Sequence, residues 1–259
     1  MLLEDKVAIV TGIGPGLGRE IAVQLAREGA AVAIGARSEP YLEEVRDEIE
    51  ATGGRAVAVR TDLAERADCD RIVQTAVDAF GGVDVVVQNG YAAPAFKTFE
   101  DADLDEWRYA MDVNLWGSLQ VAKAAVPALK ERGGGSIIFV NSMIMRKVLP
   151  LQGGYAISKG ALMTAAQVLA RELGQYKIRV NSVVPGWMWG PSVEGYFHYM
   201  EKQFGRTHDD LSAEITANIA LGVIPPDEEC ARAAVFLASE MASMVTGQAI
   251  DVNGGEVFH

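Results

Sequence analysis

Short apolar runs rich in β-branched residues alternate with longer helical patterns along most of this chain. The predicted strands are Lys6–Thr11, Ala31–Ile34, Ala56–Arg60, Val83–Gln88, Ser136–Val140, Arg179–Val184 and Ala249–Val252. The predicted helices are Gly16–Glu28, Pro40–Ala51, Arg66–Phe80, Leu104–Arg132 and Gly154–Gln175. Such alternation is typical of βαβ units, which form a parallel sheet with helices on both faces. Because crossovers are right-handed, we expect an α/β fold with an open, doubly wound, mostly parallel seven-stranded sheet.

The alternation is broken between Pro185 and Pro226, which we interpret as an irregular segment. This segment is too long for an ordinary connection, and long loops in compact domains are usually functional. The 259 residues suit one large domain or two small ones, and no linker-like or low-complexity segment divides them. We therefore expect a single domain over residues 1–259, with a ligand-covering lid at about residues 186–226.

A glycine-rich turn joins the first predicted strand to the first predicted helix. It reads T-G-I-G-P-G-L-G from Thr11 to Gly18. Glycine permits positive φ and close backbone approach, and free N–H groups at the start of a helix attract phosphate. A tight turn without a ligand is the alternative, but the position between a strand and a helix is the context that a phosphate-binding turn requires.

Tyr155 and Lys159 are separated by one helical turn, and Ser142 precedes them. Side chains at i and i+4 project from one helix face and can meet one ligand. A free tyrosine has a pKa near 10. An ammonium at about 4 Å stabilises the phenolate by up to roughly 4 kcal/mol, which could lower the pKa of the tyrosine toward 7. That is where general acid–base catalysis is most effective. Taken alone, the pair is more often part of a half-exposed helix face.

Taken together and in order, these motifs resemble the short-chain dehydrogenase/reductase family over essentially the whole chain. The resemblance rests on T-G-x-x-x-G-x-G, on Ser142 with the Y-x-x-x-K of Tyr155 and Lys159, and on the family's other marks. Those marks are Asp62, Asn89, Asn114 and Pro185-Gly186. The resemblance implies a Rossmann fold and an NAD(P)-dependent oxidoreductase that interconverts a ketone or aldehyde with an alcohol.

The resemblance also implies roles for four catalytic residues. Tyr155 would exchange a proton with the substrate oxygen, while Lys159 would lower its pKa and hold the nicotinamide ribose. Ser142 would donate a hydrogen bond to the substrate oxygen, and Asn114 would hold a water that links Lys159 to solvent. For Asn114 the alternative is a capping or core amide. For Ser142 it is a strand-end hydroxyl satisfied by the backbone.

The dinucleotide site implied by the resemblance uses residues after several strands. The expected cofactor-binding residues are Gly12, Gly14, Gly16, Leu17, Gly18, Arg37, Asp62, Leu63, Asn89, Gly90, Tyr155, Lys159, Pro185, Gly186 and Met188. NAD-preferring sites usually carry an acid at the end of the second strand, whereas this chain has Arg37 there. Because Arg37 can pair with a 2′-phosphate, we favour NADP(H), with NAD(H) as the alternative if Arg37 is only a solvated surface residue.

Two positions depart from the family pattern. Tyr91 replaces the last glycine of N-N-A-G, which puts the local backbone in doubt, and Gly190 replaces the threonine of P-G-x-x-x-T. The expected substrate-binding residues are Met143, Trp187, Trp189 and Tyr196. Because small-molecule pockets are usually apolar and aromatic, we expect a hydrophobic or cyclic carbonyl or alcohol substrate. The alternative is that these side chains pack the lid against the body.

The composition limits the partners and location. A net charge of −12 disfavours nucleic acid and anionic membrane surfaces. The two cysteines and three histidines lack metal-ligand spacing, so we expect no metal site. No secretory layout or bilayer-length apolar stretch occurs, so we expect a cytoplasmic protein. The family resemblance implies a homodimer or homotetramer, which an exposed apolar face on the Leu104–Arg132 or Gly154–Gln175 helix would fit.

Two other classes of function compete with this interpretation. A non-catalytic dinucleotide-binding sensor or scaffold on this fold commonly loses the tyrosine or the lysine, and this chain keeps both. Epimerase and dehydratase relatives carry a larger C-terminal domain, and enoyl reductase relatives usually space the tyrosine and lysine more widely. We therefore disfavour these alternatives.

Overall fold

The computed structural model describes residues 1–258 and contains one seven-stranded sheet in the order β3-β2-β1-β4-β5-β6-β7. All neighbouring strands pair in parallel. The strands are β1 (Val7–Thr11), β2 (Ala31–Ala36), β3 (Arg55–Arg60), β4 (Val85–Gln88), β5 (Gly135–Val140), β6 (Ile178–Pro185) and β7 (Ala249–Val252). The predicted fold class and the seven strands are confirmed, and the sheet is wholly rather than mostly parallel.

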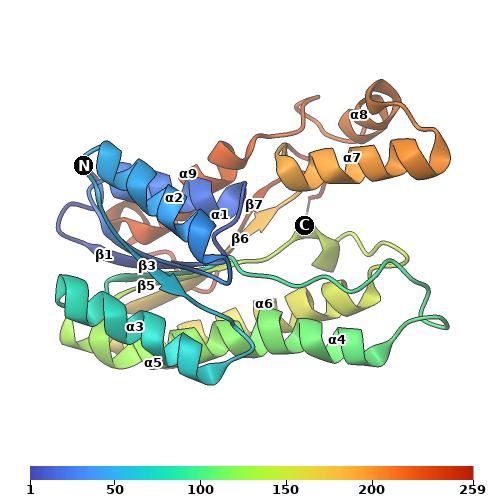
Figure 1. Cartoon of the computed structure of the whole chain (residues 1–259). Helices are drawn as coiled ribbons and strands as arrows, with labels where there is room; N and C mark the ends of the chain where they lie inside the picture. The colour runs from blue at the N-terminus through green and yellow to red at the C-terminus, as the bar shows by residue number, and fades with distance from the viewer. Residues whose placement is uncertain (259) are drawn as a thin grey trace.

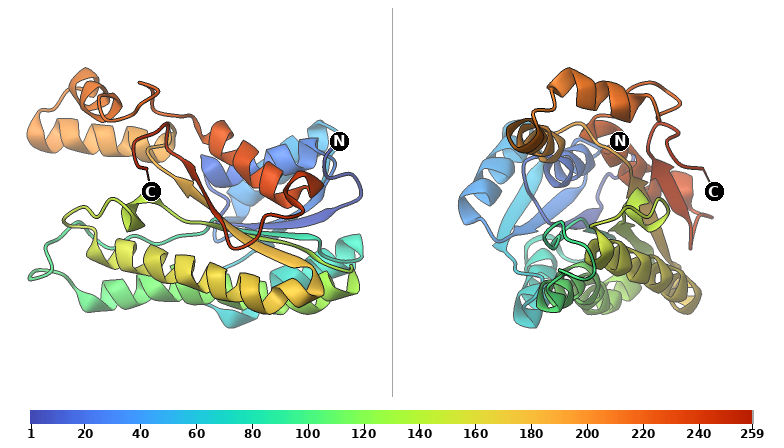
Figure 2. Two further views of the ribbon diagram at one scale, coloured as in Figure 1. Left: turned by 180° about the vertical axis from the view of Figure 1, so that it is seen from behind. Right: turned by 90° about the vertical axis from the view of Figure 1, so that its right-hand side faces the viewer.

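Helices cover both faces of the sheet, as Figures 1 and 2 show. One layer contains α1 (Leu17–Arg27), α2 (Glu39–Ala51) and α9 (Asp227–Ala238). The opposite layer contains α3 (Arg66–Phe80), α4 (Leu104–Met111), α5 (Ser118–Glu131) and α6 (Gly153–Leu173). Two further helices, α7 (Pro191–Phe204) and α8 (His208–Thr216), lie beyond the sheet at one end of the molecule.

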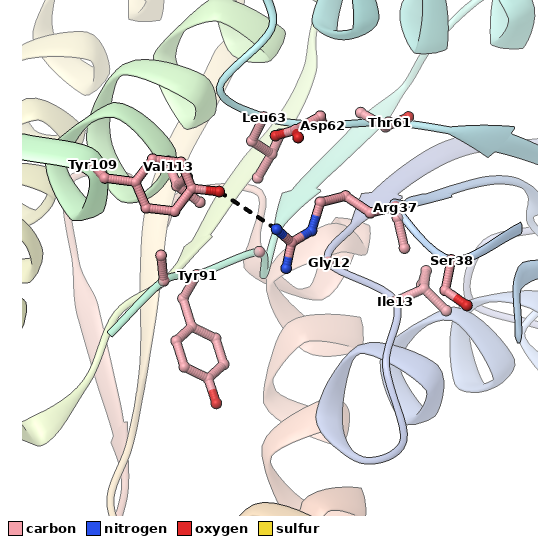
Figure 3. A pocket seen from close by; sticks show the side chains of 13 residues that line it. Gly12, Ile13, Arg37, Ser38, Thr61, Asp62, Leu63, Tyr91, Tyr109 and Val113 are labelled. Atoms are coloured by element: carbon pink, nitrogen blue, oxygen red, sulfur yellow. Dashed lines mark hydrogen bonds between the residues drawn. The ribbon is translucent and has the colours of Figure 1, made fainter. Parts of the chain in front are cut away.

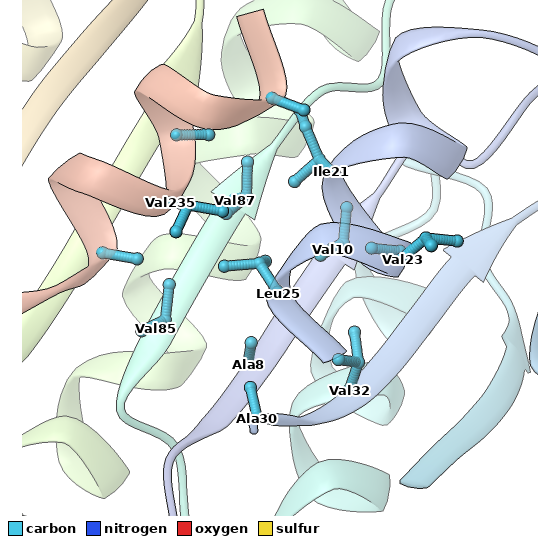
Figure 4. Packing of buried hydrophobic residues seen from close by; sticks show 14 of the residues in the cluster. Ala8, Val10, Ile21, Val23, Leu25, Ala30, Val32, Val85, Val87 and Val235 are labelled. Atoms are coloured by element: carbon cyan, nitrogen blue, oxygen red, sulfur yellow. The ribbon is translucent and has the colours of Figure 1, made fainter. Parts of the chain in front are cut away.

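The strand side chains explain this layered arrangement. Successive residues of a strand point to opposite faces, so both faces of each central strand must be apolar if both are covered. In β1, Ala8 and Val10 pack toward α1 and α9, whereas Val7 and Ile9 belong to the opposite core. Figure 4 shows Val10 beside Ile21 of α1. The core is therefore two apolar layers separated by the sheet.

Two segments differ from the sequence prediction. The predicted helix Leu104–Arg132 contains a π-helical turn over Asp112–Gly117 between α4 and α5. The interpretation of Pro185–Pro226 as irregular is wrong, because α7 and α8 lie within it. These helices bury a small apolar cluster of their own, which includes Phe197 and Leu211. An amphipathic pair with so small a core gives a weak periodic signal beside the long buried strands.

Among residues 1–258, no helix has the length and apolar character needed to cross a membrane.

Candidate active site

The candidate site lies where the strand order changes direction. From β1 the chain builds outward through β2 and β3, and then returns to place β4 on the other side of β1. Crevices at the carboxyl ends of strands beside such a switch point are the usual ligand sites of open α/β sheets. A cavity of about 520 Å³ lies there, and the residues that line it include Gly14, Asn89, Ser142, Tyr155 and Lys159. The topology therefore brings the glycine turn and the predicted catalytic residues to one cavity.

A second cavity adjoins the first and shares Gly12 and Tyr91 with it. Its volume is about 290 Å³, and Figure 3 shows Arg37, Asp62 and Leu63 around it. Arg37 is exposed, and its Nη1 donates a hydrogen bond of 3.4 Å to the Tyr109 hydroxyl. Tyr109 was missed from the sequence because nothing in the pattern of α4 distinguishes it from other surface aromatics.

The glycine turn is tightly packed on one side and open on the other. Gly12 has φ +72°, and a Cβ on it would lie 2.2 Å from the Gly90 amide nitrogen. A Cβ on Gly18 would lie 2.3 Å from the Gly12 carbonyl oxygen, which also accepts a 2.8 Å hydrogen bond from Asn89. By contrast, nothing lies within 4 Å of a Cβ built on Gly14.

The open side of the turn suits an anion. Gly16 is the N-cap of α1 and supplies no side-chain cap, so the first N–H groups of the helix stay available for a ligand. The close backbone contacts fix the turn, and the space above Gly14 leaves room for the pyrophosphate of a dinucleotide. The residues present therefore fit a dinucleotide cofactor.

Tyr155 and Ser142 meet inside the cavity. Both side chains line it, and the Ser142 hydroxyl, which accepts a long bond of 3.3 Å from the Ile144 amide, lies close enough to the phenol to affect its pKa. Burial raises the pKa of Tyr155 above its usual value, the nearby Tyr91 raises it further, and the Ser142 hydroxyl opposes both effects. Burial in this geometry therefore favours the protonated, neutral form of Tyr155.

The lowering of the Tyr155 pKa by Lys159 stays a prediction, since burial, Ser142 and Tyr91 are the influences on the phenol that this arrangement shows. The ammonium lies 5.8 Å from the centroid of the Tyr155 ring, and Nζ donates a 2.7 Å hydrogen bond to the Val140 carbonyl oxygen. Lys159 is 2% exposed, and burial lowers its own pKa to about 7. Loss of hydration therefore favours the uncharged form of both side chains.

Asn114 is a fully buried amide that ties two elements together. Its Nδ2 donates to the Ala92 carbonyl oxygen at 2.9 Å and to the Ser158 hydroxyl at 2.8 Å, while its Oδ1 accepts from the Ala92 amide at 2.7 Å. Ser158 in turn donates to the Tyr155 carbonyl oxygen at 2.7 Å. The predicted water relay stays a prediction. In this structure, Asn114 links the segment after β4 to the helix that carries Tyr155 through these hydrogen bonds.

The predicted substrate residues fall into two groups. Met143 and Trp187 line a cavity of about 140 Å³ that also includes Ser142. Trp189 packs against Phe197 and His208 within the α7–α8 cluster, at ring-centroid distances of 5.7 Å and 5.3 Å. The Tyr196 ring packs at a tilt against the Trp187 ring, with 5.4 Å between the ring centroids. The structure thus brings Met143 and Trp187 next to the site and gives Trp189 a packing role.

The two departures from the family pattern have structural explanations. Tyr91 has no positive φ, so a side chain is accommodated there without backbone strain. Its ring lies 6.0 Å from the ring of Tyr155 and forms a wall common to both cavities. Gly190 faces Asp227, because a Cβ on it would lie 2.3 Å from Asp227 Oδ2. A threonine at position 190 would clash with that carboxylate.

Comparisons with known proteins agree with the fold and the motifs. A family model described as enoyl-(acyl carrier protein) reductase matches residues 12–256. An uncharacterized oxidoreductase from Methylorubrum extorquens is 37% identical, and the match covers 98% of both chains. L-rhamnose 1-dehydrogenase (NAD(P)(+)) from Azotobacter vinelandii is 36% identical over 98% of both chains. Dehydrogenase/reductase SDR family member 4 from Bos taurus is 33% identical over 99% of this chain and 89% of its own.

A solved structure shares the complete fold. The short-chain type dehydrogenase/reductase from Mycobacterium ulcerans superposes with a TM-score of 0.91 at 29% identity, covering 99% of this chain and 91% of its own. With the glycine turn, the Ser142–Tyr155 contact and the parallel sheet already described, these matches establish the family. The chain belongs to the short-chain dehydrogenase/reductase family and is an oxidoreductase that acts on CH–OH donors with NAD(P).

Proposed function

We propose that this protein is an NADP-preferring reductase or dehydrogenase for a hydrophobic or cyclic ketone and its secondary alcohol. The observation that carries the proposal is that Ser142, Tyr155 and Lys159 line the same cavity as the open glycine turn. A bound nicotinamide supplies or accepts the hydride. The chain's own residues bind the dinucleotide, position the substrate oxygen and move its proton.

In this proposal the substrate oxygen lies between Ser142 and Tyr155. Because burial keeps the phenol protonated, Tyr155 is ready to donate its proton to the oxygen of a carbonyl that is being reduced. The Ser142 hydroxyl donates a second hydrogen bond to the charge that develops on that oxygen. Lys159 holds the ribose of the cofactor, and as a buried group with a pKa of about 7 it can return a proton to Tyr155 near neutral pH.

The preference for NADP rests on charge. Arg37 is exposed at the rim of the second cavity, where a 2′-phosphate of the adenosine half would meet its guanidinium. The apolar lining contributed by Met143 and Trp187 supports an uncharged substrate. The α7–α8 segment, which carries Trp187 at its entry, serves as the lid.

The substitution Tyr155→Phe tests the mechanism. We expect kcat to fall by about 10²- to 10⁴-fold, which is the usual contribution of a general acid–base group. The Kd of the dinucleotide should change by less than about threefold, since the phenyl ring is kept. Tyr176→Phe removes a surface phenol and should change neither quantity. Unchanged turnover in Tyr155→Phe would sink the mechanism.

A substrate panel separates the remaining candidates. The description of the matching family model favours reduction of an enoyl thioester as a second candidate, although the four-residue spacing of Tyr155 and Lys159 disfavours it. The panel therefore contains cyclic ketones, secondary alcohols, aldoses and an enoyl thioester, each with NADP(H) and NAD(H). Dinucleotide binding without turnover of any member would favour the sensor or scaffold alternative.

A further inference from the structure

Asp227 is an acidic side chain placed against the glycine turn. It is the first residue of α9, is 9% exposed and lines the same cavity as Gly14, Tyr155 and Lys159. A Cβ on Gly16 would lie 2.9 Å from Asp227 Oδ2. The carboxylate therefore lies against the end of the turn where the pyrophosphate of the proposed cofactor would bind. Nothing in the sequence identified this residue, because the fold brings position 227 to position 16.

Three helices begin around this carboxylate. Their N-caps are Gly16 for α1, Gly190 for α7 and Pro226 for α9, and none of the three supplies a side-chain cap. Helix N-termini carry unsatisfied N–H groups and attract anions. A carboxylate at their junction occupies the kind of position that a phosphate would take.

The carboxyl group of Asp227 has no cationic partner. Across residues 1–258 it takes part in no ion pair or hydrogen bond. The charged groups that bear on it are acidic: Glu228 on its own helix and Glu20 on α1. Arg19 of α1 is engaged by Glu20 and Glu48 instead, and α7 brings the Pro191 ring toward the turn.

Burial, with smaller contributions from the negative charges of Glu228 and Glu20, raises the pKa of Asp227 to about 6. The carboxyl group is consequently neutral in mildly acidic solution and negatively charged at higher pH. A second anion brought to the same place would favour the neutral form still more, so binding and protonation of this group are linked.

We propose that Asp227 makes dinucleotide affinity depend on protonation, the neutral acid admitting the pyrophosphate and the carboxylate repelling it. The proposal rests on the dinucleotide site proposed above. Its sign is fixed: affinity is highest below the pKa of Asp227 and falls as the pH rises through it. Binding above that pH takes up to one proton from solution, and this proton goes to the Asp227 carboxylate.

The test is isothermal titration calorimetry of the full chain with NAD⁺, which has no phosphomonoester that titrates in this range. Titrations at pH 5.5 and pH 8, each in two buffers of different ionisation enthalpy, give both the Kd and the number of protons taken up. For the wild type we expect binding about ten- to hundredfold weaker at pH 8 than at pH 5.5, with proton uptake, because affinity falls by at most about one decade per pH unit above a pKa of about 6.

Asp227→Asn keeps the shape of the side chain and removes its titration. We expect it to bind NAD⁺ more tightly than the wild type at pH 8, and to take up fewer protons there than the wild type, because Lys159, with a pKa of about 7, titrates in both proteins. Glu229→Gln is the matched control, because it removes one negative charge from the exposed side of the same helical turn. It should keep the pH dependence of the wild type.

Three outcomes would overturn the proposal. The first is wild-type binding that is independent of pH and takes up no proton, a result that stands even if the variant fails to fold. The second is an Asp227→Asn variant that folds, as judged by circular dichroism, and keeps the wild-type pH slope. The third is absence of NAD⁺ and NADP⁺ binding at every pH, which would overturn the proposed dinucleotide function as well and is thereby distinguishable from the other two.

Discussion

Tyr155 and Lys159 project from one face of α6, but each is controlled by different neighbours. Ser142 and Tyr91 affect the pKa of the Tyr155 phenol, whereas the Lys159 ammonium donates a hydrogen bond to the Val140 carbonyl oxygen. The sequence spacing correctly placed both residues on one helix and in one cavity. It could not reveal how deeply they are buried, and burial shifts both pKa values in the direction that favours the uncharged form.

Arg37 gives a prediction at the same scale. The substitution Arg37→Ser should weaken NADPH binding by about tenfold or more, because a charge-assisted hydrogen bond is worth about 1.5 to 3 kcal/mol. Binding of NADH should be nearly unchanged, since NADH lacks the 2′-phosphate. Fluorescence titration of each reduced cofactor measures both constants.

The control for Arg37 is Arg46→Ser. Arg46 is a basic residue on α2 that pairs with Glu43 and Asp47, outside both cavities. The Arg46→Ser substitution should change neither the affinity for NADPH nor the affinity for NADH. A wild-type protein that binds NADH as tightly as NADPH would contradict the assignment of Arg37 to a 2′-phosphate.

At the scale of elements, the sequence predicted the strands, whose side chains form the core, better than it predicted local departures from regular helix geometry. The central strands are buried and carry continuous apolar runs, and the edge strands β3 and β7 are only partly buried but keep short runs rich in apolar residues, so all seven were found. The π-helical turn over Asp112–Gly117 left no signal, because its residues continue the helical pattern of α4 and α5. Such turns often occur at functional sites, and this one contains Asn114, which fastens the segment after β4 to α6.

The glycine turn gives a prediction about an element. Gly12→Ala should destabilise the protein by about 2 to 4 kcal/mol, because the new side chain meets a positive φ and a backbone atom at 2.2 Å. Gly14→Ala should change stability by less than about 0.5 kcal/mol, because Gly14 has no positive φ and open space beside it. Urea unfolding followed by circular dichroism compares the two variants. A lower unfolding midpoint for Gly14→Ala than for Gly12→Ala would show that the turn is not held as described.

At the scale of the whole molecule, parallel topology assembles the site from distant parts of the chain. Residues after β1, β4, β5 and β6 meet because parallel strands end at the same edge of the sheet. Each of these positions could be predicted, since each directly follows a recognisable strand. Asp227 and Tyr109 could not, because they come from helices whose relative placement depends on three-dimensional packing.

The outer surface of the α4–α6 layer carries apolar side chains that the monomer leaves exposed. Trp116 is 53% exposed and Ile157 is 55% exposed, and their helical segments pack side by side. Exposed apolar area of this kind is a common feature of subunit interfaces. We propose that the chain forms a homodimer or homotetramer through this surface.

Charged substitutions test the assembly. In an interface of the usual size, which buries about 1,600 Å² in total, one buried charge without a partner is enough to prevent association. We therefore expect Ile157→Glu and Trp116→Glu to convert the protein to a species with the mass of one chain in size-exclusion chromatography with light scattering. Met244→Glu changes an apolar side chain that is 93% exposed and lies outside this surface, so it should leave the assembly intact. A wild-type protein that elutes with the mass of one chain at micromolar concentration would refute the interface. If Met244→Glu were the one variant of the three to dissociate, the subunit contact would instead involve the segment after α9.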